Sequence, residues 1–320
     1  MTLMKAVVYN KKYSPYKLRI SEIGKSIPSV NEVLVKVISV SLNAADYRSL
    51  KIGIIPKKKI FGSAVSGTIE SVGRNVRQFK AGDAVVGDLT DFKFGGLAEY
   101  TAAAEKAFTL KLANTSFEDA VTLPVAATTA LQALREKGKI HAGQKVLIVG
   151  SAGGVGTSAI QLAKYFGAKV TAVCSSKNVA QSIDLGADKV IDYTKTDFTK
   201  GSDRYDLILA INGNYPLLGY RRILNSNGTY VMVGGTLGQV LKSIFFGWLF
   251  SFGGKKMKTL SAKADQEDLA YLVQLLDEGK FNAIIHKRYT LDEAAEAMDD
   301  LSKGHCPSNV VINIEQSNLL

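Results

Sequence analysis

The stretch at residues 145–166, KVLIVGSAGGVGTSAIQLAKYF, decides the fold of this chain. It begins as an almost continuously apolar run, typical of a buried strand, and passes through a glycine-rich turn into a segment with helical apolar spacing. Glycines at this spacing, between a strand and a helix, predict a turn that binds the phosphates of a dinucleotide. Gly153 would let the backbone approach the pyrophosphate, and Gly156 would let the helix pack closely on the strand.

The start of the predicted helix adds a second attraction for phosphate. Its free N–H groups and the positive end of its dipole favour an anion. Ser151 replaces the first glycine of the usual pattern, and as a small residue it still permits the turn. We therefore expect cofactor contacts from Ser151, Gly153, Gly154, Val155 and Gly156.

The segments on either side predict the domain organisation. After about residue 117, apolar strands alternate with helix-length stretches through KVTAVC, KVIDY, YDLILA and GTYVMVG, which builds a doubly wound parallel sheet. Before residue 104, short runs rich in Val, Ile and Tyr predict a compact, barrel-like all-β unit. The C-terminal part returns to mixed elements, with helices expected at 266–278 and 291–301 and strands at 284–289 and 309–314.

The second strand of the alternation indicates which dinucleotide binds. In NAD sites this strand usually ends in an acidic residue about 20 residues after the glycines, but here Cys174 is followed by Ser175, Ser176 and Lys177. Two hydroxyls and a cation suit the additional 2′-phosphate of NADPH, which an acidic residue would repel. We therefore expect NADPH. Ser175 and Ser176 are also suited to capping the next helix, and both roles can coexist.

Composition excludes several classes of protein. The 320 residues suffice for about two domains, and 46% hydrophobic with 22% charged residues is typical of a globular protein. Two cysteines and three histidines cannot supply a disulfide framework or a cysteine-rich zinc site. The apolar runs are too short for a signal peptide or a transmembrane helix, so we expect a cytoplasmic protein. The net charge of +11 reflects either scattered solubilising lysines or an anionic partner.

Motifs along nearly the whole chain resemble those of one enzyme family. They are SLNAADYR (41–48), AGDAVVG (81–87), GGLAEY (95–100), LPVAATTALQAL (123–134), SAGGVG (151–156), LGADKVIDY (185–193) and GTYVMVGG (228–235). Together they resemble the zinc-independent, ζ-crystallin-like quinone oxidoreductases of the medium-chain dehydrogenase/reductase superfamily. The resemblance implies an α/β homodimer with a GroES-like β-barrel catalytic domain (1–120, with a C-terminal return at 263–320). It also implies a Rossmann-type doubly wound parallel sheet at 121–262 that binds NADPH.

The resemblance also implies that the zinc site has been lost. Zinc-dependent relatives hold their catalytic metal with a Cys, a His-Glu pair and a second Cys. The matching positions here are Asn43, Ser63, Ala64 and Val125, which do not ligate zinc. The segment at 82–100 is also too short, and has no Cys, for a structural zinc lobe. We therefore expect no metal, and direct hydride transfer from NADPH to a quinone or an α,β-unsaturated carbonyl.

Further cofactor contacts follow from the same resemblance. Thr129 would lie beside the nicotinamide, and Tyr193 and Gly234 would also touch the cofactor. In relatives a Lys that follows a Gly before the last strand reaches the cofactor. This chain has Ser308 and Asn309 there, so the contact expected from Asn309 is weakened or lost.

Hydride transfer to such a substrate places negative charge on its oxygen, which a hydrogen-bond donor must stabilise. The candidate donors are Tyr47 and Asn43, with solvent supplying the final proton. Tyr47 could instead be an aromatic residue packed in the cleft wall, and Asn43 could brace its loop through backbone hydrogen bonds. We expect Asp46 to act as a helix N-cap rather than as an acid or base.

The segment 240–258, VLKSIFFGWLFSFGGKKMK, combines apolar aromatic residues with three lysines within four positions. It could cover the substrate cleft, pack at a subunit interface or lie on an acidic membrane surface. An alternative function also stays open. The chain could be a basic NADPH-binding protein with vestigial catalysis, associated with nucleic acid or an acidic membrane.

Overall fold

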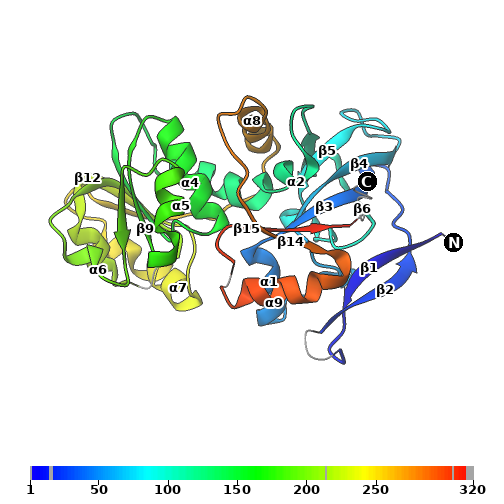
Figure 1. Cartoon of the computed structure of the whole chain (residues 1–320), viewed down its shortest axis with the longest axis horizontal. Helices are drawn as coiled ribbons and strands as arrows, with labels where there is room; N and C mark the ends of the chain where they lie inside the picture. The colour runs from blue at the N-terminus through cyan, green and yellow to red at the C-terminus, as the bar shows by residue number, and fades with distance from the viewer. Residues whose placement is uncertain (1, 14–16, 213–214, 305, 315–320) are drawn as a thin grey trace. The chain divides into compact units, whose positions relative to one another are not determined.

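A computed structural model describes residues 2–13, 17–212, 215–304 and 306–314 (Figure 1). The chain forms two compact units, each described by itself: residues 1–128 with 263–320 make the first, and residues 129–262 make the second. The sequence suggested a first boundary at residue 120, whereas the structure divides the chain after Thr128. The kinked segment at Leu123–Ala127 therefore belongs to the first unit.

The first unit is built around one long strand, β3 (Glu32–Leu42), which has three neighbours. It pairs with β4 (Ala64–Val72) along most of its length, with β6 (Tyr100–Ala104) near its start and with β15 (Asn309–Asn313) near its end. Two register shifts in the β3–β4 pair let the sheet bend. The full order is β14-β15-β3-β4-β5-β7, and the unit is the GroES-like barrel domain that the sequence predicted. The other strands of this sheet are β5 (Ala84–Asp88), β7 (Phe108–Leu110) and β14 (Ile285–Thr290).

The N-terminal hairpin contains a strand that the sequence did not predict. β1 (Leu3–Tyr9) was expected, and it pairs antiparallel with β2 (Leu18–Gly24). Only Leu18 of β2 is fully buried, so the strand has no apolar run to mark it. Its pairing with β1 makes it a strand.

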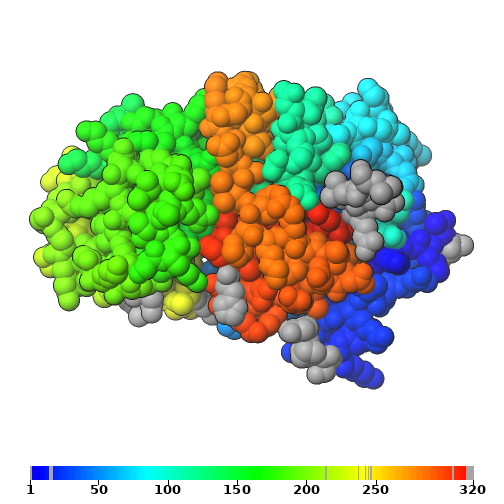
Figure 2. Space-filling view, in the orientation of Figure 1, coloured from blue at the N-terminus to red at the C-terminus, as the bar shows by residue number. Residues whose placement is uncertain are grey.

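Helices of the first unit pack around this barrel. They are α1 (Ala44–Ile52), α2 (Phe117–Ala120), α8 (Gln266–Asp277) and α9 (Ala294–Ser302). α8 and α9 lie within or near their predicted ranges, and in the space-filling view their orange atoms form part of the outer surface (Figure 2). No helix in the described part of the chain is long and apolar enough to cross a bilayer.

The second unit is the doubly wound parallel sheet that the alternation predicted. Its order is β10-β9-β8-β11-β12-β13, with all pairs parallel. Successive strands run outward from β8 in both directions, so the switch point between β8 and β11 lies where such sheets bind ligands. The strands are β8 (Lys145–Val149), β9 (Lys169–Cys174), β10 (Lys189–Asp192), β11 (Tyr205–Ala210), β12 (Leu224–Met232) and β13 (Lys256–Thr259). The helices are α4 (Gly154–Tyr165), α5 (Val179–Asp184), α6 (Leu217–Arg222) and α7 (Leu237–Phe246), while α3 (Thr128–Gln132) begins at the boundary.

Candidate functional site

The turn between β8 and α4 is fixed by backbone geometry. Gly150 has φ +88, and a Cβ there would lie 2.8 Å from the backbone nitrogen of Asn212. The N–H groups of Gly150 and Ser151 both donate to the Val173 carbonyl. The buried Ser151 hydroxyl also donates to Val173 O (3.2 Å) and lies 3.2 Å from Ser182 Oγ. Ser151 therefore ties the turn to the end of β9 through its N–H as well as its side chain, and its contact with a cofactor stays a prediction.

The other two glycines of the turn differ in the space around them. Gly153 is the N-cap of α4, and a Cβ there would meet no atom within 4 Å. A Cβ on Gly156 would lie 2.3 Å from the Gly150 carbonyl oxygen. The helix start is thus open at Gly153 and tightly packed at Gly156, as expected for a turn that admits a pyrophosphate to a helix N-terminus. Gly154 and Val155 form the first turn of α4 between them.

A carboxylate lies beside the segment that follows β9. Ser176 donates from Oγ to Asp192 Oδ2 (2.5 Å), and Asp192 also accepts from the amide (3.0 Å) and hydroxyl (2.7 Å) of Thr194. The hydrogen bonds from Ser176 and then Thr194 lower the pKa of Asp192 to about 2, so it is ionised at neutral pH. Lys195 lies 3.6 Å from it. Residues 174–177 themselves contain no carboxylate, but the fold brings Asp192 beside them, which the sequence analysis did not foresee.

The register of the sheet explains this carboxylate. β10 pairs parallel with β9, and Asp192 is the direct partner of Cys174. The strand ends of a parallel sheet meet at one edge, so the residues after Cys174 and after Asp192 become neighbours. A reading of the sequence that had paired these two predicted strands would have found Asp192.

The remaining predicted cofactor residues lie as follows. In the second unit, Lys177 is exposed, Tyr193 is 50% exposed, and Thr129 and Gly234 are half-buried. Ser175 occupies an N-cap position, where its hydroxyl accepts from the side-chain amide of Asn178 rather than from the backbone (3.1 Å).

Asn309 is in the first unit, where it is buried and donates to the Ile284 carbonyl (3.0 Å). The Asn309 side chain therefore braces the start of β15, and its contact with a cofactor stays a prediction.

In the first unit, the buried carboxylate of Asp46 accepts hydrogen bonds from residues around the start of α1. Asp46 accepts hydrogen bonds from the amide of Asn43 (2.9 Å), the amide of Gly62 (2.9 Å) and the hydroxyl of Ser63 (2.7 Å). Burial raises the pKa of Asp46 to about 6, although the three hydrogen bonds act to lower it. The N-cap of α1 is Asn43, and Asp46 is the third helical residue, which completes a capping box. The expectation that Asp46 is itself the N-cap is therefore wrong by one turn, because its carboxylate reaches back to Asn43.

The positions that match zinc ligands in relatives come together in this unit but do not fit a metal. The Asn43 amide donates to Ser41 O (2.9 Å) and lies 3.4 Å from Ser63 Oγ. Ala64 and Val125 belong to one small apolar cluster. No three His, Cys, Asp or Glu side chains of the described residues lie close enough together to hold a metal.

Val125 in that cluster has a strained backbone. Its φ and ψ are +62° and −64°, a region that β-branched residues rarely adopt. The amide of Val125 donates to the buried carboxylate of Asp88, which also accepts from the Thr90 amide (2.8 Å). Asp88 therefore helps to hold the kink that leads into α3, the helix that carries Thr129.

Tyr47 lines a hollow in the first unit. The hollow has a volume of about 370 Å³. Its walls are Lys17, Tyr47, Leu50, Lys51, Ala295, Met298, Asp299 and Ser302. Among the described residues, none forms a hydrogen bond with the Tyr47 hydroxyl. Tyr47 is thus half-buried beside a space, whereas the neighbouring Asn43 has its amide engaged inside the protein.

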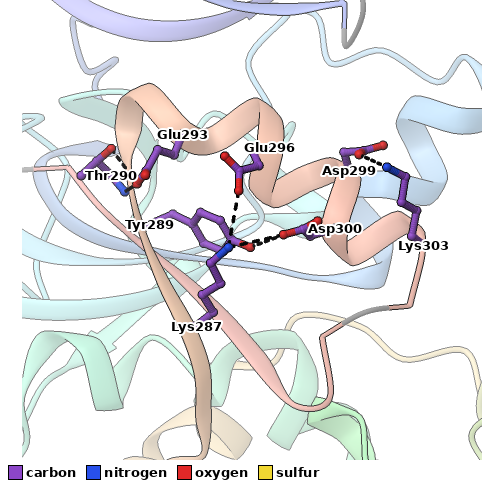
Figure 3. Close-up of polar contacts among 8 residues, drawn as sticks. All are labelled: Lys287, Tyr289, Thr290, Glu293, Glu296, Asp299, Asp300 and Lys303. Carbon is purple, nitrogen blue, oxygen red and sulfur yellow. Dashed lines mark hydrogen bonds and ion pairs between the residues drawn. The ribbon is translucent and has the colours of Figure 1, made fainter.

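The α9 wall of the hollow is fixed by a polar network that sequence analysis missed (Figure 3). Tyr289 on β14 donates to Asp300 Oδ2 (2.6 Å), and burial followed by this bond raises its pKa to about 12. Lys287 lies 3.5 Å from Asp300 and 3.4 Å from Glu296. Figure 3 shows these side chains reaching from β14 to one side of α9. No local motif marks them, since the partners lie on separate elements.

Comparisons with known proteins agree with both units. The family model described as the alcohol dehydrogenase GroES-like domain matches residues 29–114, and the one described as zinc-binding dehydrogenase matches residues 185–312. The chain is 32% identical over 327 residues to a chloroplastic quinone-oxidoreductase, QR1, of Triphysaria versicolor, covering 97% of this chain and 98% of the relative. This chain belongs to the quinone oxidoreductase branch of the medium-chain dehydrogenase/reductase superfamily. It is therefore an oxidoreductase of a family that uses nicotinamide cofactors.

Other members of the superfamily resemble it over most of their length. A solved quinone oxidoreductase from Coxiella burnetii superimposes with a TM-score of 0.87 at 30% identity, covering 98% of this chain and all of that one. The NADPH-dependent alkenal/one oxidoreductase of Arabidopsis thaliana is 33% identical over 259 residues, covering 70% of this chain and 67% of the relative. The 2-methylene-furan-3-one reductase of Solanum lycopersicum is 32% identical over 310 residues, covering 91% and 74%.

Proposed function

We propose that this chain is an NADPH-dependent, zinc-independent reductase that transfers hydride to a quinone or to the alkene of an α,β-unsaturated carbonyl compound. The observation that carries the proposal is the glycine turn, open at Gly153 and tightly packed at Gly156. The names of the relatives, which include quinone oxidoreductases and an alkenal/one oxidoreductase, support the substrate class.

Cofactor binding rests on backbone groups and on a balance of charges. The first turn of α4, from Gly154 and Val155 to Gly156, would hold the pyrophosphate. Tyr193, half exposed, offers a ring face for the adenine. Lys177 and Lys195 would attract a 2′-phosphate, and Asp192 would oppose it. When bound, the cofactor supplies the hydride.

The first unit would supply the donor to the substrate oxygen. The Asn43 side-chain amide already donates hydrogen bonds to Ser41 and Ser63. Its role is therefore to position the start of α1. Tyr47, next to a hollow and without a hydrogen-bond partner among the described residues, is the better donor. A donor aimed at the developing oxyanion typically contributes about 10²–10³ in turnover.

The side chains at the four matching positions support the proposal of zinc independence. An amide, a hydroxyl, a methyl group and an isopropyl group at Asn43, Ser63, Ala64 and Val125 offer no set of zinc ligands. A reductase built this way depends on hydrogen bonds to stabilise charge on the substrate. We also propose that the enzyme is a cytoplasmic homodimer, in which the β13 edge of the sheet pairs with a second copy, which sedimentation would test.

The test is oxidation of NADPH with a panel of short-chain quinones, alkenals and alkenones. We expect turnover that NADH supports less well and that a zinc chelator leaves unchanged. Binding of NADPH would be measured separately through its fluorescence. Tight NADPH binding with no turnover on any substrate would contradict the reductase and support the alternative of a cofactor-binding protein with vestigial catalysis.

A further inference from the structure

The positive charge of this chain is concentrated in two stretches of the first unit. Residues 9–20 and 47–62 contain nine Lys and Arg residues and no Asp or Glu, although the net charge of the whole chain is only +11. All nine side chains except that of Arg48 are exposed. Among the residues that the structure describes, none of the nine forms an ion pair. Such a concentration of unpaired charge favours an anionic ligand.

The two stretches meet in the fold. The end of β1 lies against the second stretch, since the Tyr9 N–H donates to the Lys59 carbonyl (2.8 Å) and Val8 forms an antiparallel bridge with Ile60. The second stretch also contains most of α1, which packs against α9 (Figure 1). We call the two stretches together the cationic region.

The hollow beside Tyr47 borders on the cationic region. Tyr47 and Lys51 are one helical turn apart on α1, and Lys17 reaches the hollow from the connection between β1 and β2. The other wall is one face of α9, with helical spacing of Ala295, Met298, Asp299 and Ser302. The Tyr47 hydroxyl and two ammonium groups therefore line one space.

The charges around the hollow favour an anion. Among the described residues, neither the Lys17 nor the Lys51 ammonium group has a hydrogen bond or an ion pair. The carboxylate among the described lining residues is that of Asp299, and it already pairs with Lys303. Lys51 also lies in the last turn of α1, where the helix dipole favours a cation, but Lys17 has no such role. Two free ammonium groups thus lie opposite one paired carboxylate.

The remaining lining residues suit a short carbon chain. Leu50, Ala295 and Met298 are apolar, and a volume of about 370 Å³ is sufficient for a small molecule. Side chains at the spacing of Tyr47 and Lys51 leave a helix about 5–6 Å apart. An anionic group held by Lys51 would therefore lie only a few bonds from an oxygen held by Tyr47.

We propose that the substrate of this reductase carries a terminal anionic group, a carboxylate or a phosphate, which Lys17 and Lys51 bind while the Tyr47 hydroxyl faces the carbonyl oxygen. The inference rests on the proposed function and names the substrate class of the same site. A neutral quinone or enone would leave both ammonium groups unused, so it would bind less tightly. Hydride transfer itself is unaffected, since the anionic group lies outside the reacting alkene.

The test compares substrates that differ only in charge. One pair is a methyl enone with a terminal carboxylate on a short alkyl chain, and its methyl ester. The other is the corresponding terminal phosphate and its alcohol. We expect the anionic member to have a kcat/KM about tenfold higher, through a lower KM at similar kcat. Higher ionic strength should reduce this preference. The pair with the larger preference identifies which anion the hollow takes.

Variants of the two lysines assign the preference to the hollow. Lys17→Gln and Lys51→Gln should each reduce it about threefold, and the double variant should abolish it. Lys51→Arg keeps the charge and should keep most of the preference. Lys58→Gln is the matched control, because it removes the same charge from the cationic region but not from the hollow. Unchanged thermal unfolding would show that each variant is folded.

The outcomes separate this inference from the proposed function. Equal kcat/KM within both pairs would overturn the inference and leave the reductase in place. A preference that survives in the double variant, or that Lys58→Gln reduces as much as Lys17→Gln does, would also overturn it, because the hollow would not be the binding site. Failure of every member of both pairs to oxidise NADPH would contradict the proposed function itself, and the inference would fall with it.

Discussion

The glycine turn of the second unit and the Asp46 cluster of the first differ in whether they leave space and hydrogen-bond donors free to contact a ligand. The turn keeps open space at Gly153 and the free amides of a helix start. The cluster uses the donors around it, since three groups converge on Asp46 and the Asn43 amide is engaged as well. The first arrangement is therefore suited to hold a ligand, and the second to hold the protein together beside a ligand.

The comparison has a consequence for the chemistry. A cluster whose donors are all engaged cannot stabilise charge on a substrate without losing a bond elsewhere. The group that does so must come from a neighbouring residue with a free hydrogen bond. Tyr47, one residue after Asp46 on α1, faces a hollow and meets that requirement.

The largest effect is expected at Tyr47. Tyr47→Phe removes the hydroxyl but keeps the ring, so turnover should fall about 10²–10³-fold while the affinity for NADPH stays unchanged. Steady-state kinetics with a quinone or an enone would measure it. Tyr100→Phe, at another half-buried tyrosine of the first unit, is the matched control. Equal turnover of wild type and Tyr47→Phe would show that Tyr47 only packs.

Two glycines of the same turn provide the next test. Gly156→Ala forces a Cβ against backbone atoms that cannot move aside, so the free energy of unfolding should fall by more than about 3 kcal/mol. Gly153→Ala has free space and φ −71, so stability should hardly change. The new methyl group should instead weaken NADPH binding. Thermal unfolding and NADPH titration measure both, and similar losses of stability in the two variants would contradict the assignment.

The buried Asp46 predicts a dependence of stability on pH. Its pKa is about 6 in the folded chain, against 3.8 for an ordinary aspartate, so the folded state binds the proton more tightly than the unfolded state. The free energy of unfolding should then fall by about 3 kcal/mol as pH rises from about 4 to 6, and stay level above that. Asp46→Asn should lack this fall. Denaturant titrations at several pH values would show it, and parallel pH profiles would exclude it.

The smallest expected effect concerns the choice of cofactor. Asp192→Asn removes a negative charge beside Ser176, so the preference for NADPH over NADH should rise about tenfold. Lys177→Ala should change the preference in the opposite direction. Asp203→Asn, which removes a carboxylate paired with Lys189, is the control. An unchanged ratio of the two dissociation constants in Asp192→Asn would place the 2′-phosphate elsewhere.

Some parts of the site were visible in the sequence because they are local. The residues of the glycine turn are contiguous, and the strand and helix that flank it follow their own periodicity. Asp192 was missed because it lies 16 residues after Ser176 and reaches it only through the pairing of β10 with β9. β2 was missed because one buried residue gives no periodic signal.

By itself, the sequence determined the two-unit α/β organisation, the phosphate-binding turn and the absence of zinc ligands at the matching positions. Each of these depends on residue type and short-range spacing. Only the tertiary structure decided that Asp46 accepts hydrogen bonds from two separate segments, at Asn43 and at Gly62 and Ser63, and that Tyr289 and Lys287 hold α9. Those features depend on which distant residues meet when strands pair and helices pack, and a linear pattern does not contain that information.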